Sequence, residues 1–151
     1  MAGTFNIKYK TRLKLQRAIQ QQIRSKGLFQ EGTMYDSVRV SSATGDLNTL
    51  YVTINSMYYY VFLDRGANLW NGGIIDAQFI TYDALNSSLG KEFQAEAVDD
   101  YVKWMLENYP ILDVAKISVD KVKVKYRYNV FGENDYGYSG FYPSGGWFED
   151  F

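Results

Sequence analysis

Few side chains in this chain could do chemistry. Its 151 residues include no histidine and no cysteine, which excludes disulfides, thiolate nucleophiles, cysteine or histidine metal sites and every Ser-His or Cys-His arrangement. Two carboxylate pairs, Asp99 with Asp100 and Glu133 with Asp135, could in principle serve acid–base or Mg²⁺ chemistry. Adjacent acids on a helix point in different directions, and acids in a glycine-rich segment are usually solvated. We therefore expect no enzyme, no cofactor and no metal site.

Tyrosine is the unusual component, with 14 copies in a chain that is 17% aromatic. Its large apolar ring and polar tip suit surfaces that become buried on assembly. The stretch MYYYVFLDRGANLW, residues 57–70, concentrates this character. We expect Asp64 and Arg65 to serve geometry rather than catalysis, with Gly66 at positive φ after a short helix. The residues that follow, Asn68 and Trp70 among them, are expected to present a contact loop to a neighbouring protein.

Charge is divided unevenly along the chain. Residues 1–30 carry seven basic and no acidic residues, whereas the remainder carries nine basic and 17 acidic residues. Opposite poles on one small domain favour head-to-tail contact between identical copies. We take Lys8, Arg12, Arg17 and Arg24 as candidate interface residues. A basic helix face that is simply solvated explains the pattern equally well.

The periodicity of the hydrophobic residues and the positions of glycine, proline and capping residues predict an α+β domain. The strands should form a small antiparallel sheet, a hairpin plus a long later strand, packed with two longer helices and one short helix. Thr11 and Ser56 are candidate N-caps, and Gly27 and Pro110 are candidate stops. The expected elements are a helix over 11–26, strands over 37–41 and 49–54, a helix over 57–65, a long loop over 67–90, a helix over 91–109, and a strand over 116–131 with a bulge or break near 120.

Basic residues alternate along the last predicted strand, at Lys121, Lys123, Lys125 and Arg127. Basic residues interleaved with aromatics can indicate nucleic-acid binding. Lysines on an edge strand more often block unwanted strand addition, and we favour that interpretation.

The residues after this strand, 132–151, are rich in glycine and aromatics and show no helical or strand period. We expect a single domain over 1–131 followed by an extended C-terminal arm. Its composition cannot order the arm, so either the domain's own surface or a neighbouring subunit must hold its aromatic side chains. We expect contact with a neighbouring subunit, through Tyr142, Trp147, Phe148 and Phe151.

The order of these elements resembles the tail-completion or head–tail joining family of tailed double-stranded DNA phages. The residues that carry the resemblance are GTMYDSVRV (Gly32 to Val40), then LYVTI, then YYYVFLDRGA (Tyr58 to Ala67). That family has a "tG-x-L-x-x-S-I-x-V" segment followed by a tyrosine-led helix of the type "Y-A-x-Y-V-E-x-G-T". Tyr60, Val61, Asp64 and Gly66 stand where the family has its tyrosine, valine, acid and glycine. Arg65 is inserted before the glycine, and Ala67 replaces the usual threonine.

The resemblance implies a structural virion protein that forms a homo-oligomeric ring of six or twelve subunits in the neck. Its partners would be portal or adaptor proteins and tail proteins, with non-specific contact to genomic DNA in the lumen. The N-terminus has no apolar signal region, and the longest apolar run, Met57 to Leu63, is too short to span a bilayer. We therefore expect synthesis in the bacterial cytoplasm and no membrane contact. The alternative is a carbohydrate-binding or adhesion module that uses surface aromatics.

Overall fold

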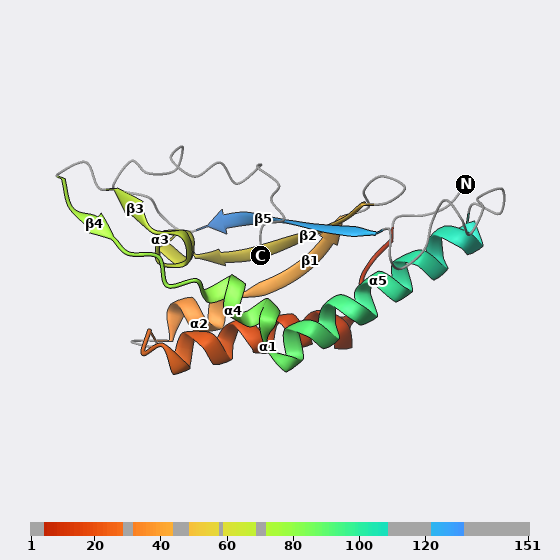
Figure 1. Cartoon of the computed structure of the whole chain (residues 1–151), viewed down its shortest axis with the longest axis horizontal. Helices are drawn as coiled ribbons and strands as arrows, with labels where there is room; N and C mark the ends of the chain where they lie inside the picture. Colours follow the sequence, from red (N-terminus) through yellow and green to blue (C-terminus); the bar gives the residue numbers. More distant parts are fainter. Residues whose placement is uncertain are drawn as a thin grey trace.

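A computed structural model describes residues 5–28, 32–43, 49–57, 59–68, 72–108 and 122–131. These residues form an α+β fold in which helices pack on one side of a small sheet (Figure 1). In chain order the elements are α1 (Tyr9–Ser25), α2 (Thr33–Ser37), β1 (Arg39–Ala43), β2 (Thr49–Met57), α3 (Tyr59–Arg65), β3 (Ala67–Asn68), β4 (Ile74–Ile75), α4 (Ile80–Asn86), α5 (Ser88–Asn108) and β5 (Lys123–Phe131).

The main sheet has the strand order β1-β2-β5. β1 and β2 form the predicted antiparallel hairpin, with Val40 opposite Ile54. β5 pairs with β2 along its whole length, from Thr49 beside Lys123 to Met57 beside Phe131, and runs parallel to it. The sheet is therefore mixed, where we expected an antiparallel one. A parallel pair needs a long crossover, and the chain between β2 and β5, which includes α3, α4 and α5, provides it.

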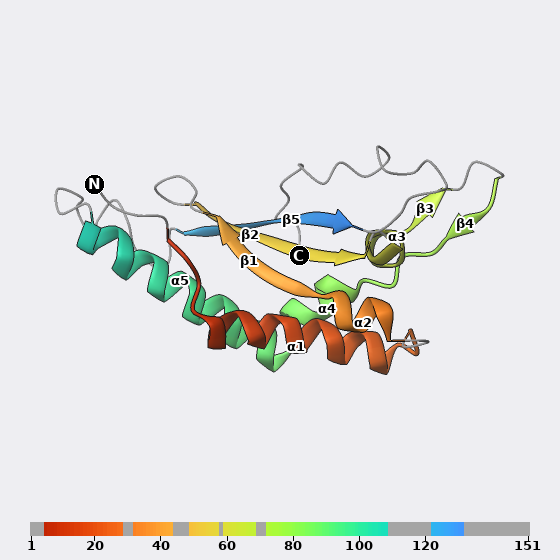
Figure 2. The ribbon, with the colours of Figure 1, turned by 180° about the vertical axis from the view of Figure 1, so that it is seen from behind.

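In both ribbon views the helices lie against one face of this sheet (Figure 2), and the buried core residues lie between the two layers. Alternate residues of β2 point into it, and Leu50, Val52 and Ile54 are each 0% exposed. α1 contributes the apolar stripe that its sequence spacing predicts: Leu15, Ala18, Ile19 and Ile23. α5 contributes a second stripe that includes Phe93, Ala97, Tyr101 and Met105.

Helix ends follow the sequence signals only in part. α1 ends as predicted, because Gly27 has φ +71° and its N–H and that of Leu28 donate to Arg24 and Ile23 carbonyls at 3.0 and 2.9 Å, a Schellman motif. Its start differs, since α1 begins at Tyr9 and Thr11 is buried within the helix instead of capping it. Ser56 is also no N-cap, because β2 continues to Met57 and α3 begins at Tyr59.

Three short elements stand where the sequence predicts a strand or a loop. Residues 33–37 form the helix α2, so the expected strand over 37–41 begins two residues late, at Arg39. The expected loop over 67–90 contains the β3–β4 hairpin, in which Ala67 pairs with Ile75 and Asn68 with Ile74. The same stretch contains α4 and the first turn of α5. The predicted break near 120 lies outside the described residues.

Candidate protein-interaction site

The turn after α3 depends on Gly66, which has φ +78° as predicted. Its N–H donates to the Phe62 carbonyl at 2.8 Å and ends the helix. A Cβ at this position would lie 2.9 Å from the Ile75 carbonyl oxygen and 3.1 Å from the Ala77 nitrogen. Glycine is therefore required twice, for its backbone angle and for the close passage of the chain after β4.

Asp64 ties three elements together from a buried position, with only 1% of the residue exposed. Its Oδ1 accepts the backbone N–H of Thr81 at 2.8 Å, and its Oδ2 accepts the Thr81 hydroxyl at 2.6 Å. The Tyr128 hydroxyl of β5 also donates to Oδ2. Because the N-cap residue of α4, Phe79, makes no side-chain cap, the carboxylate of Asp64 caps α4 from a distance. The predicted pairing of Asp64 with a backbone donor is confirmed.

Two tyrosines complete this buried network. The Tyr60 hydroxyl lies 2.6 Å from the Thr81 hydroxyl, and the rings of Tyr60 and Tyr128 meet edge to face at 6.1 Å. Burial raises the pKa of both phenols, and the nearby Asp64 charge raises it further. Both phenols therefore stay neutral at physiological pH, which leaves the Tyr128 O–H able to donate to the carboxylate.

Phe79 is held in an unusual conformation beside this network. Its φ of 53° and ψ of 43° place it in the left-handed region, where it is the sole non-glycine residue with positive φ among the described residues. A bulky side chain in that region is strained by about 1–2 kcal/mol. The turn is held by Asp64 and its neighbour: the Phe79 N–H donates to the Asp64 carbonyl at 3.1 Å, and the Gln78 N–H donates to the Leu63 carbonyl at 2.7 Å.

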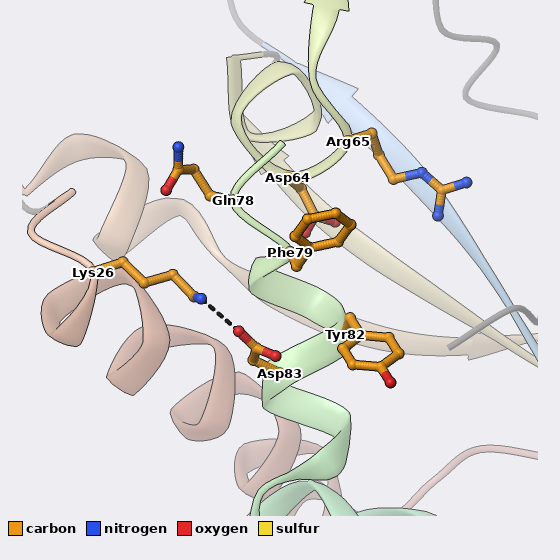
Figure 3. Close-up of a pocket in the computed structure, with 7 residues that line it drawn as sticks. All are labelled: Lys26, Asp64, Arg65, Gln78, Phe79, Tyr82 and Asp83. Atoms are coloured by element: carbon orange, nitrogen blue, oxygen red, sulfur yellow. Dashed lines mark hydrogen bonds and ion pairs between the residues drawn. The ribbon is translucent and has the colours of Figure 1, made fainter. Parts of the chain in front are cut away.

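The strained turn places the side chain of Phe79 at the surface, and 58% of this residue is exposed to solvent. Tyr82, one turn further along α4, is 45% exposed. Both line a surface pocket of about 610 Å³ (Figure 3). The remaining lining residues come from α1, α3 and α4 and their flanks: Lys26, Asp64, Arg65, Gln78 and Asp83. Lys26 and Asp83 form an ion pair across the pocket, joining the end of α1 to α4.

The pocket contains two of the predicted interface residues, and a third lies near it. Asp64 is at its buried wall, and Arg65 is exposed at its rim, with its side chain directed away from Lys26 (Figure 3). Asn68 is exposed at the end of β3, in the neighbouring β3–β4 hairpin. Trp70, Tyr142, Trp147, Phe148 and Phe151 lie outside the described residues.

The predicted basic interface residues on and beside α1 divide into different environments. Lys8 forms an ion pair with Asp100 of α5, with 3.7 Å between the Lys8 Nζ and the Asp100 Oδ2. Arg12 is half-buried, with its guanidinium 5.7 Å from the Tyr9 ring centroid. Arg24 is exposed and lies 4.7 Å from the Tyr35 ring centroid, and Arg17 is exposed. Only part of the basic segment therefore faces outward.

Sequence reasoning missed Phe79 and Tyr82, the two exposed aromatics of the site. The glycines at 72 and 73 suggested a long loop, although Ile80, Thr81, Ala84 and Leu85 already have the spacing of one buried helix face. Read that way, the same spacing would have placed Tyr82 off the buried face. No sequence signal indicates that Phe79 adopts a positive φ.

Comparison with family models, curated proteins and solved structures finds no significant match. Within the described residues, no helix is long and apolar enough to cross a membrane. Those residues also contain no cluster of acidic side chains that could hold a metal ion.

Proposed function

We propose that this chain is a structural virion protein of a tailed phage, which forms a ring in the neck between head and tail through protein–protein contacts without catalysis. The observation that carries the proposal is the Phe79 turn. An energetically strained residue persists only where the surroundings hold it, and such strain concentrates at functional positions. Here the surroundings are the Asp64 network, and the result is an exposed pair of aromatics beside an exposed arginine.

The residues that carry the family resemblance support this interpretation. Tyr60, Asp64 and Gly66 are parts of the network that builds the turn. Their positions in the motif thus correspond to a structural device that shapes an outward surface. Aromatic side chains and arginine are the residue types that most often dominate binding energy at protein interfaces. We take Phe79, Tyr82 and Arg65 as the centre of a contact with the next subunit or with a portal, adaptor or tail protein.

A single substitution separates assembly from folding. Phe79→Asn replaces the aromatic ring with a side chain that tolerates positive φ. We expect the free energy of unfolding to stay equal or rise by up to about 1 kcal/mol, while self-association, measured by native mass spectrometry and sedimentation, weakens at least tenfold. Tyr9→Asn is the matched control: Tyr9 is 66% exposed, and it lies about 25 Å along α1 from Lys26.

Two results would contradict the proposal. One is a wild-type chain that stays monomeric at every concentration and is missing from purified particles of its phage by peptide mass spectrometry. The other is a Phe79→Asn variant that associates as the wild type does. A ring of six or twelve subunits that contains the wild-type chain would support it.

Carbohydrate binding remains a second candidate, because an aromatic pair beside polar groups is also what sugar stacking requires. Phe79 and Tyr82 flank a pocket that includes Gln78 and Asp83. A glycan array probed with the isolated chain distinguishes the two functions. Glycan binding that is lost in Phe79→Asn, without any assembly, would favour the adhesion module.

A further inference from the structure

One face of the main sheet carries no described helix. In both ribbon views α1, α2, α4 and α5 lie on the same side of β1, β2 and β5. The opposite face is formed by the alternate strand positions whose neighbours point into the core. Its members with described side chains form a set that we call the basic sheet face: Arg39, Ser41, Thr49, Tyr51, Thr53, Asn55, Met57, Lys123, Lys125, Arg127 and Asn129.

Hydrogen bonds across the strands fix the polar members of this face. Asn129 Nδ2 donates to Asn55 Oδ1 at 2.8 Å, and Asn55 Nδ2 donates to Ser41 Oγ at 3.2 Å, so the three strands are linked. Arg127 Nε donates to Thr53 Oγ1 at 3.2 Å. The face is thus a preorganised polar platform, which lowers the entropic cost of binding a partner.

The charge on this platform has one sign. Its members include four basic residues, Arg39, Lys123, Lys125 and Arg127, and no acidic residue. The three on β5 alternate along the strand, so their Cα atoms are spaced by about 6.6 Å. A row of like charges on a sheet face is unfavourable unless solvent or an opposite charge compensates it. The natural ligand is an extended, acidic segment.

We propose that the basic sheet face is the docking surface for the chain's own residues 132–151. This segment contains four acidic residues, Glu133, Asp135, Glu149 and Asp150, and no basic residue. It also contains seven aromatic residues, which supply apolar area for packing against Tyr51 and the aliphatic stems of the lysines. The docking requires neither a ring nor a second copy, so it stands independently of the proposed function. It replaces the contact with a neighbouring subunit that the sequence analysis expects for this segment by a contact within the chain.

The attachment point allows this docking. The segment begins directly after Phe131, the last residue of β5. Extended, its twenty residues reach about 66 Å, whereas the nine-residue strand β5 is about 30 Å long. A tethered segment has an effective concentration in the millimolar range, so the chain's own segment has an advantage over any dilute partner. Gly132 at the junction permits the reversal of direction.

The absence of cysteine among the 151 residues allows a direct test in the whole chain given by this sequence. Ser144→Cys is combined with Ser41→Cys on the basic sheet face, and a short bismaleimide is added. The matched control combines Ser144→Cys with Gln21→Cys, an exposed position of α1 on the helical side. We expect cross-linking within one chain at least ten times faster for the first pair, and slower cross-linking at high salt. Equal rates, or cross-links only between chains, would overturn the proposal.

A charge variant identifies the interaction and distinguishes nucleic acid from the segment. Lys123→Glu with Lys125→Glu should lower the cross-linking rate of the Ser41/Ser144 cysteine pair at least fivefold. Lys91→Glu with Lys103→Glu, the same charge change on two exposed positions of α5, should leave that rate unchanged. Fluorescence anisotropy with a duplex DNA probe is the second readout. Tight, salt-dependent DNA binding by the wild-type chain that disappears in the Lys123/Lys125 variant would show that the face binds nucleic acid and overturn the proposal.

Discussion

At the scale of residues, glycines with similar backbone angles have different surroundings. Gly66 and Gly27 have φ of +78° and +71°, but a Cβ on Gly66 would meet backbone atoms at 2.9 and 3.1 Å, whereas one on Gly27 would meet nothing within 4 Å. Gly27→Ala should therefore lower the free energy of unfolding only by the left-handed strain, about 1 kcal/mol. Gly66→Ala should cost about 2 kcal/mol more, because the Ile75 and Ala77 backbone must shift. Urea unfolding of both variants measures the difference, and equal losses would refute the close-passage argument.

The buried phenols also predict a pH dependence. Burial raises the folded-state pKa of Tyr60, Tyr126 and Tyr128 above 10.0, the ordinary value of a tyrosine phenol, and the Asp64 charge adds to the rise for Tyr60 and Tyr128. Above pH 10 the unfolded chain loses these protons and the folded chain keeps them. Stability is thus fully present below pH 10 and falls as pH rises beyond it, by about 1.4 kcal/mol per pH unit for each tyrosine.

Unfolding experiments between pH 9 and 11.5 measure this slope. Tyr126→Phe should make it shallower by about 1.4 kcal/mol per pH unit. Tyr82→Phe is the matched control, since Tyr82 is 45% exposed and lies outside the core. A slope that Tyr126→Phe leaves unchanged would contradict the assignment.

The sequence could predict that Asp64 lies at a turn, but it could not predict which residues Asp64 contacts. An acid two residues before a helix-ending glycine indicates a carboxylate near a turn, and Asp64 and Gly66 have this spacing. Its partners are 17 and 64 residues away, at Thr81 and Tyr128. Contacts over such separations leave no periodic signal in a single sequence, so the capping of α4 from α3 could not be foreseen.

At the scale of elements, the junction between α4 and α5 depends on Gly90. A Cβ there would lie 1.9 Å from the Ala84 carbonyl oxygen and 2.6 Å from the Leu85 Cα, both backbone atoms of the preceding helix. Glycine within a helix normally costs about 1 kcal/mol relative to alanine. Gly90→Ala should reverse that sign and destabilise the chain by about 3 kcal/mol or more, because α4 must move away from α5.

Lys91→Ala, at the next and exposed position of α5, is the control for helix propensity and should change the free energy of unfolding by less than about 0.5 kcal/mol. Chemical denaturation of both variants tests the close approach. Stabilisation by Gly90→Ala would mean that the two helices are not in backbone contact.

Long elements were predictable and most short ones were not, although the seven-residue helix α3 lies within the predicted range 57–65. α1, α5 and β2 show their period over many residues and lie near the predicted positions. α2, α4 and the β3–β4 hairpin span five, seven and two-plus-two residues. Helices this short are unstable alone, so tertiary contacts such as the Asp64 cap determine whether they form. The direction of β5 relative to β2 was also out of reach, because strand alternation is the same in parallel and antiparallel pairs.

At the scale of the whole molecule, the charge asymmetry of the sequence is partly neutralised inside the fold. Lys14 pairs with Glu92 and Glu96 of α5, and Lys26 pairs with Asp83 of α4. Together with Lys8 and Asp100, these ion pairs lie between the basic segment and the helices beside it. Such pairs align α1 with α4 and α5 more than they add stability, since exposed ion pairs are weak.

Exposed basic residues line one face of α1 and form a stripe along it. Lys10, Arg17 and Arg24 are exposed and spaced by seven residues, so they share a face of α1. In a ring with a repeated head-to-tail contact, this stripe would meet a different, acidic surface of the next copy, for which exposed Asp76 and Glu107 are candidates.

Lys10→Glu with Arg17→Glu should therefore weaken self-association at low salt, as measured by sedimentation, while leaving urea unfolding unchanged. Lys14→Glu should instead lower the free energy of unfolding and leave self-association unchanged, because Lys14 pairs with Glu92 and Glu96 within its own chain. At 1 M salt the screening length falls to about 3 Å, so the difference in association between wild type and the stripe variant should disappear. A stripe variant that associates normally at low salt would mean that α1 is a solvated basic face, and assembly would then depend on Phe79 and Tyr82 alone.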